Sequence, residues 1–198
     1  MRRADSGFNL VELLVAMAVT ALSLSLAAPS LDRLSAGIRL RLAAGEVTGA
    51  LQQARAFAIA HDCKVGVKFR TEADGSVSFA LYRDGDGDGV RNDDIVAGVD
   101  PMAEPGRTLE HLGRRARFGF PPGGAPRDPA DPSRRLARRD DPIRFNRSDL
   151  ASFSPLEGST PGSVYLTDGQ RRLVVVRLDS RSGRPHLLVW DPDADRWR

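Results

Sequence analysis

The sequence predicts an α+β protein in which a long N-terminal helix, transmembrane in its first half, packs on a small antiparallel β-sheet head. Three features of the 198 residues carry this prediction: an apolar run near the N-terminus, helical periodicity that continues to about residue 62, and the alternation typical of strands after it. A chain of this length holds one modest domain besides an anchor, since domains commonly have about 100 to 150 residues.

The apolar run predicts a transmembrane helix over residues 8–28, because this segment contains no Lys, Arg, Gly or Pro. A helix of roughly 20 residues spans about 30 Å of hydrocarbon. Arg2 and Arg3 precede the run, so the positive-inside rule predicts a cytoplasmic N-terminus and an exported remainder. The alternative is an ordinary secretory signal that is cleaved near Ala27 or Ala28.

One carboxylate, Glu12, lies inside the apolar run. A charge within a spanning helix costs about 2.5 to 3.5 kcal/mol on insertion scales, and a disposable signal gains nothing from it. A retained helix gains a site that pairs with a cation of another subunit, because opposite charges attract strongly in a low-dielectric medium. The alternative is that Glu12 snorkels at the interface and has no partner.

The start of the chain carries a family resemblance. Gly7 followed by Phe8, with Glu12 inside "GFNLVELLVAMAV" after a short basic leader, resembles the class III signal of type IV pilins and type II secretion pseudopilins. Asn9 stands where Thr is more usual. The resemblance implies that a prepilin peptidase removes the leader 1–7 after Gly7 and methylates the new amine of Phe8. It also implies that Glu12 pairs with the N-terminus of a neighbouring subunit during assembly.

Helical periodicity resumes after Pro29, a residue that we expect to kink or break the helix where the membrane ends. We predict an amphipathic periplasmic helix over residues 29–62, with one face on the head and the other on neighbouring subunits. The segment Leu51 to Phe69, "LQQARAFAIAHDCKVGVKF", resembles the helix end and first strand of H-type minor pseudopilins and FimT-type minor pilins. Two apolar stripes define the opposite faces: Leu31, Leu34, Ile38 and Leu42; and Leu40, Ala43, Val47, Leu51, Ala54 and Ala58.

Residues 63–198 are expected to form the β-rich head. Residues 64–70 and 76–83 flank a turn and predict a hairpin, whereas 163–167, 173–178 and 186–190 predict an antiparallel meander. The C-terminal stretch that begins at Ser152 is similar to the corresponding part of the H-type family.

The middle of the head, residues 120–142, is rich in Pro, Gly, Arg and Asp and has few apolar residues. We expect a flexible insertion between strands there, because such a composition buries too little surface to become ordered by itself.

The stretch "DGDGDGVRNDDI" begins like a calcium-binding loop. Its twelfth residue is Ile95, however, where a bidentate acid is required. The stretch therefore has two interpretations, a calcium site or a solvated acidic turn, since Asp and Gly also favour turns. The candidate ligands are Asp84, Asp86, Asp88, Asn92 and Asp94.

Arginine is dense in the same middle region, and clustered arginines can neutralise the phosphates of DNA. Interleaved aspartates partly cancel this field, so DNA binding stands beside the simpler interpretation of a compositional bias. The candidate DNA contacts are Arg134, Arg135, Arg138 and Arg139. No histidine spacing suits zinc and no catalytic constellation is present, so nothing in the sequence argues for an enzyme or for a cofactor other than calcium.

The function that the resemblance implies is that of an H-type minor pseudopilin, a structural subunit of the type II secretion pseudopilus that supports protein export. Its implied partners are other pseudopilins or pilins, the prepilin peptidase and the inner-membrane assembly platform. Its implied location is the inner membrane, as a single-pass protein with a periplasmic head, and then the periplasmic filament. One alternative is a FimT-like minor pilin of a type IV pilus that binds DNA for uptake. Another is a secreted binding domain behind an ordinary signal.

Overall fold

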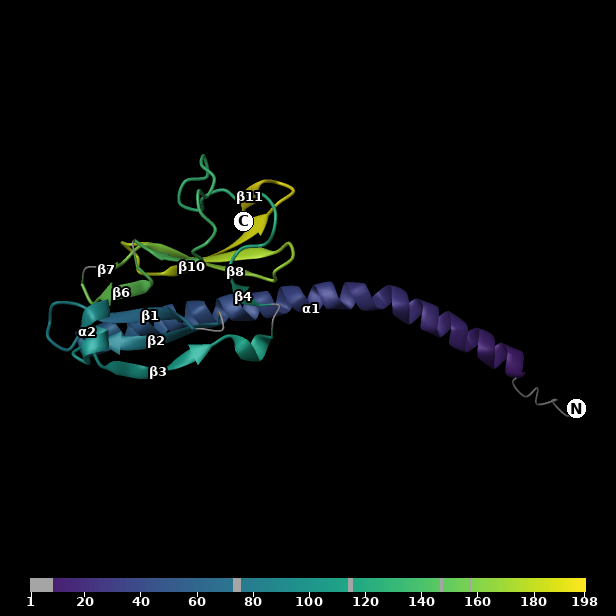
Figure 1. The fold of residues 1–198 in the computed structure, drawn as a ribbon, viewed down its shortest axis with the longest axis horizontal. Coiled ribbons are helices and arrows are strands. Elements are labelled where there is room, and N and C mark those ends of the chain that lie inside the picture. Colours follow the sequence, from purple (N-terminus) through teal and green to yellow (C-terminus); the bar gives the residue numbers. More distant parts are fainter. Residues whose placement is uncertain (1–8, 73–75, 114–115, 147, 157) are drawn as a thin grey trace, which may run out of the picture. The chain divides into compact units, whose positions relative to one another are not determined.

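The computed structural model describes residues 9–72, 76–113, 116–146, 148–156 and 158–198, without the side chains of 26–33. The chain divides into two units, Met1–Ala36 and Gly37–Arg198. Helix α1 (Leu10–His61) contributes to both, and Figure 1 shows it together with the strands of the second unit. The predicted leader and Phe8 lie outside the described residues.

The first unit contains the N-terminal half of α1. Asn9 starts the helix: its carbonyl accepts the N–H of Leu13 at 3.1 Å, and its side-chain oxygen accepts that of Val11 at 3.3 Å. Of the two outcomes expected at Pro29, a kink or a break, the structure excludes the break, because α1 is one element of 52 residues. A proline removes only one backbone donor, and a long helix with many other hydrogen bonds tolerates that loss.

Across the described residues, no helix has the length and apolar character that crossing a membrane requires. The predicted span 8–28 extends beyond them at Phe8 and at the side chains of 26–28.

The second unit begins with the C-terminal half of α1, whose two faces differ as predicted. The exposed face carries Ile38 and Leu42, each 53% exposed. The opposite face is almost completely buried because it packs on the strands. It consists of Leu40, Ala43, Ala44, Val47, Leu51, Ala54 and Ala58.

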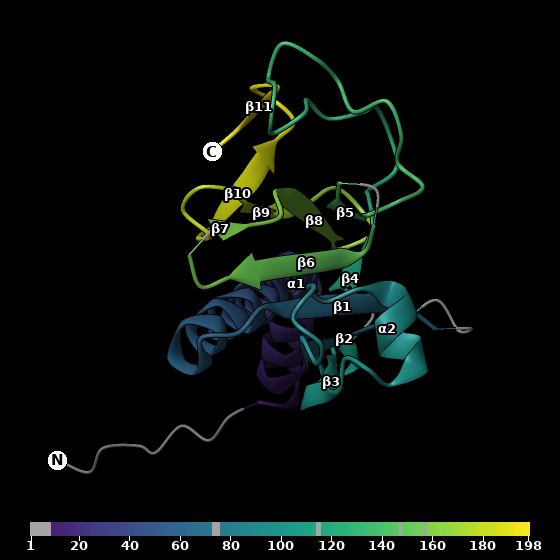
Figure 2. The ribbon, with the colours of Figure 1, turned by 90° about the vertical axis from the view of Figure 1, so that its left-hand side faces the viewer.

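The strands of the second unit form two antiparallel sheets, seen from two sides in Figure 1 and Figure 2. The first has the order β3-β2-β1-β6-β7, and the second has the order β11-β10-β9-β8-β4, with β5 also paired to β8. The bounds in the first sheet are β1 (Val65–Thr71), β2 (Val77–Arg83), β3 (Met102–Thr108), β6 (Leu150–Ser154) and β7 (Gly158–Ser159). Those in the second are β4 (Arg117–Phe118), β5 (Ile143–Phe145), β8 (Gly162–Thr167), β9 (Leu173–Leu178), β10 (Pro185–Asp191) and β11 (Arg196–Trp197).

The register confirms both predicted strand arrangements. Val67 pairs with Leu81 in the β1–β2 hairpin, and β8, β9 and β10 form the meander. Two short helices were not predicted, α2 (Asn92–Ala97) and the 3-10 helix η1 (Glu110–Leu112).

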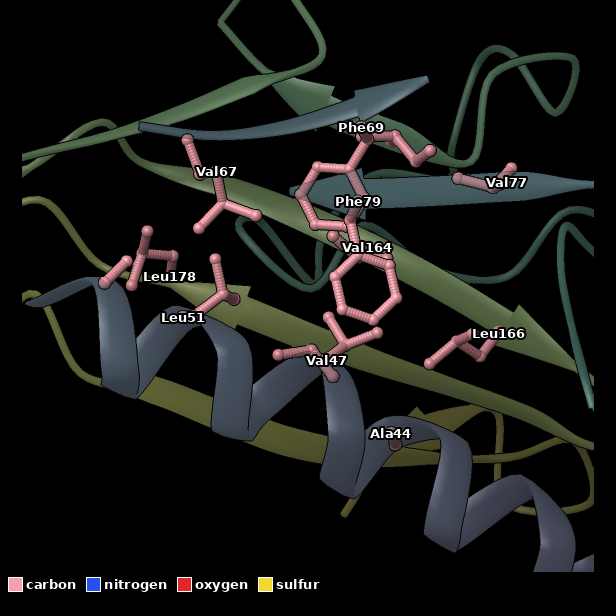
Figure 3. Close-up of a cluster of buried hydrophobic side chains, with 14 of the residues drawn as sticks. Ala44, Val47, Leu51, Val67, Phe69, Val77, Phe79, Val164, Leu166 and Leu178 are labelled. Carbon is pink, nitrogen blue, oxygen red and sulfur yellow. The ribbon is translucent and has the colours of Figure 1, made fainter. Parts of the chain in front are cut away.

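One hydrophobic core joins the helix to both sheets. Figure 3 shows Val47 and Leu51 of α1 pointing toward the strands that carry Phe79 and Val164. The ring of Phe69 stacks on that of Phe145 with 5.8 Å between centroids. Because full burial of such side chains contributes about 1.5 to 3 kcal/mol each, this core accounts for the attachment of the helix to the head.

Part of the insertion 120–142, which we expect to be flexible, packs against the second sheet. Leu136 is only 5% exposed and packs with Tyr165 and Leu173. The ring of Phe120 lies 4.7 Å from that of Tyr165, and Trp197 donates its indole N–H to the carbonyl of Arg127 at 2.7 Å. The apolar partners come from β8, β9 and β11, so a few apolar residues in the insertion are enough to anchor it.

Candidate functional site

Glu12 lies in the first turn of α1 among exposed apolar side chains. Leu10 is 70% exposed and Leu13 is 52% exposed. Within the described part of the chain, the Glu12 carboxylate has no hydrogen bond or ion pair. Gly7 and Phe8, the predicted processing residues, lie outside the described residues, so their role stays a prediction.

The acidic loop, defined here as residues 84–91, is organised by the carboxylate of Asp84. Its two oxygens accept backbone N–H groups from Gly87 at 2.7 Å, Gly89 at 2.9 Å and Asp86 at 3.2 Å. Both glycines have positive φ, 93° and 103°, which a side chain would disfavour. Burial alone would raise the pKa of Asp84, but the three donated hydrogen bonds together lower it below its ordinary value.

The structure brings three of the five predicted calcium ligands together. Carboxylate oxygens of Asp84, Asp86 and Asp88 lie within 4.8 Å of one another, and Asp94 does not belong to this group. Asn92 and Asp94 instead form part of α2, where the carbonyl of Asp94 accepts the N–H groups of three later residues, Gly98, Val99 and Asp100. The loop therefore does not bring all five candidate ligands together, as the calcium-binding motif would require.

Asp100, which the sequence analysis missed, closes this region. It is 1% exposed, and its two carboxylate oxygens accept the N–H of Gly85 at 3.0 Å and that of Arg91 at 2.9 Å. Gly85 has to be a glycine, since a Cβ there would lie 1.9 Å from the carbonyl oxygen of Val99. No local pattern could have revealed Asp100, because it reaches back 15 positions along the chain.

Most of the predicted DNA-contacting arginines already have partners in the molecule. Arg135 binds Asp195 at 3.0 Å, Arg138 binds Asp140 at 3.1 Å, and Arg139 donates to the carbonyl of Gly123 at 2.5 Å. Among the four, only the Arg134 side chain has no hydrogen bond or ion pair with another described residue, whereas the Arg134 backbone bonds with Asp128 and Asp131. Phosphate binding would have to compete with these contacts, which weakens the DNA hypothesis.

The chain was compared with models of protein families, with curated proteins and with solved structures, and none of these comparisons found a match.

Proposed function

We propose that the chain is an H-type minor pseudopilin, a structural subunit that is stored in the inner membrane and built into a periplasmic filament for protein export. The observation that carries the proposal is the division of α1: side chains 10–25 are all exposed and include Glu12, whereas the half from residue 37 packs on antiparallel sheets. The class III signal resemblance at Gly7 and Phe8 supports the same assignment.

The physical reasoning starts from the exposed apolar side chains. A helix whose exposed side chains are apolar on all sides needs a lipid or protein environment. A carboxylate in that environment needs a cation, since an unpaired charge there is strongly unfavourable. The amine that cleavage would generate at Phe8 of another subunit supplies such a cation, and Glu12 would then set the register between neighbouring helices.

The central experiment compares wild type with Glu12→Gln and Glu12→Asp. We expect both variants to be inserted and processed. Glu12→Gln should enter filaments poorly because it has lost the charge, whereas Glu12→Asp should retain a substantial part of the incorporation. Filament fractions probed for the tagged subunit give the measurement, and normal incorporation of Glu12→Gln would remove the proposed role of Glu12.

Mass spectrometry of the mature N-terminus tests the processing step and separates the alternatives. The proposal predicts an N-methylated Phe8, whereas an ordinary signal predicts a start near Ala28 or Pro29 and thus a secreted binding domain. A FimT-like pilin would share the methylated Phe8 and would in addition shift DNA in a salt-sensitive manner.

A further inference from the structure

The second unit contains an open groove of about 540 Å³ between α1 and the segment that leads into β10. The helix contributes Gln52, Arg55, Ala56 and Ile59, and residues 183–186 form the other wall. No step of the proposed membrane anchoring uses this groove.

Arg55 is the notable residue of the groove, because it is half-buried and its guanidinium has no hydrogen bond or ion pair with any described residue. Gly183 lies against it with φ 57°, and a Cβ on Gly183 would approach the Arg55 Nε to 3.2 Å. The backbone thus confines the Arg55 side chain. A partly desolvated charge without a partner is unfavourable, so this guanidinium favours the approach of an anion.

The neighbouring side chains define what kind of anion fits. Arg184 on the other wall is exposed, and its guanidinium likewise has no hydrogen bond or ion pair with a described residue, so the groove is basic. Ile59 is 56% exposed and lies four residues after Arg55, which places both on one face of the helix. The complementary surface therefore needs an apolar side chain next to a carboxylate.

Helix α2 of the same protein has this combination. Val96 is 84% exposed, and Asp93, three residues before it, is exposed and has no ion pair or side-chain hydrogen bond within the described residues. Asp86, in the acidic loop just before α2, is exposed as well. Figure 2 shows α2 on one side of the head and the C-terminal end of α1, with the start of β10, on the other.

We propose that the groove of one copy binds α2 of a second copy, with Val96 packed on Ile59 and the Asp93 carboxylate facing Arg55. The two surfaces differ and lie on different sides of the head, so the contact between the two copies is heterologous. The inference rests on the proposed function for the setting of subunit assembly, and it adds the partner and the contacting surfaces.

Charge reversal in the full-length protein in detergent micelles tests the contact. All proteins carry Glu12→Gln, so that pairing of the N-terminal helices does not contribute to the signal. The groove variant is Arg55→Glu with Arg184→Glu, and the loop variant is Asp86→Lys with Asp93→Lys. We expect each variant alone to self-associate at least about tenfold more weakly than the parent, because like charges then face each other.

Mixing the two variants provides the decisive comparison. The acidic groove of one then meets the basic loop of the other, so sedimentation velocity should show mixed oligomers that neither variant forms alone. A matched control, Arg70→Glu with Arg196→Glu, reverses two exposed arginines elsewhere and should associate like the parent. A monomeric parent, unchanged association of the variants, or no recovery in the mixture would each overturn the contact while leaving the Glu12 experiment unaffected.

Two apolar variants keep the test interpretable if a charge reversal disturbs folding. Ile59→Ser and Val96→Ser change exposed side chains, so both should melt like the parent. We expect each to weaken association several-fold, and association equal to that of the parent would contradict the proposed packing.

Discussion

The buried carboxylate of Asp100 accepts the backbone N–H of Gly85 at 3.0 Å and thereby joins the end of the α2 region to the beginning of the acidic loop. Its other oxygen accepts the N–H of Arg91, at the residue before α2. The side chain of Asp100 thus holds both ends of the acidic loop, which leads into α2.

Asp100→Ala should lower the free energy of unfolding by about 1 to 3 kcal/mol, because the change removes the buried carboxylate that accepts the N–H groups of Gly85 and Arg91. Urea unfolding followed by circular dichroism gives the measurement. Asp193→Ala is the matched control: Asp193 pairs with Arg171 on the surface, where ion pairs contribute about 0 to 1 kcal/mol. Equal effects of the two substitutions would show that the Asp100 contacts do not stabilise the loop.

Asp84→Asn should destabilise the protein in a pH-dependent way. The folded-state pKa of Asp84 is lowered from its ordinary value of 3.8, so its ionised form contributes stability above that value. This contribution disappears as the pH falls through the lowered folded-state pKa.

A protonated Asp84 offers one carbonyl acceptor, as Asn does, so the stability difference between wild type and Asp84→Asn should be largest near neutral pH and vanish in strong acid. Urea unfolding at a series of pH values measures it. A difference that stays constant down to the lowest pH would contradict the role assigned to the Asp84 carboxylate.

Leu136→Ala tests the packing of the insertion 120–142. Because Leu136 is 5% exposed and lies among Tyr165, Leu173 and Val175, we expect a loss of about 2 to 4 kcal/mol in unfolding free energy. Ala137→Gly, at the exposed neighbouring position, should cost less than about 1 kcal/mol. A Leu136→Ala variant as stable as wild type would show that the packing of Leu136 does not stabilise the insertion.

The regular parts of the fold were predictable because their signals are local. The burial of Val47 and Leu51 follows from helical spacing, and the pairing of Val67 with Leu81 follows from two alternating segments around a short turn. The division into two sheets was not predictable, since it depends on which distant strands pair, as β1 does with β6.

The candidate sites show the same limit. The grouping of Asp84, Asp86 and Asp88 follows from their alternation in the sequence, whereas the contribution of Asp100 depends on a chain reversal that no motif encodes. The packing of the insertion likewise depends on Trp197 and Tyr165, which lie far from it in the sequence. The composition of a segment indicates how much apolar surface that segment can bury by itself. It does not include the apolar surface that other segments contribute.

Calcium should raise the melting temperature if the acidic loop binds it. Sites in extracellular proteins often have Kd values of about 0.1 to 1 mM, and at 1 mM affinity a calcium concentration of about 10 mM would add roughly 1.4 kcal/mol. For a chain of this size that corresponds to a shift of about 3 to 6 °C.

Asp86→Asn with Asp88→Asn should abolish the shift, because both carboxylates belong to the group that the structure brings together. Asp94→Asn should retain it, because the Asp94 carboxylate lies outside that group. Identical melting with calcium, with magnesium and without either ion would leave the loop as a solvated acidic turn, whose shape Asp84 and Asp100 maintain through backbone hydrogen bonds alone.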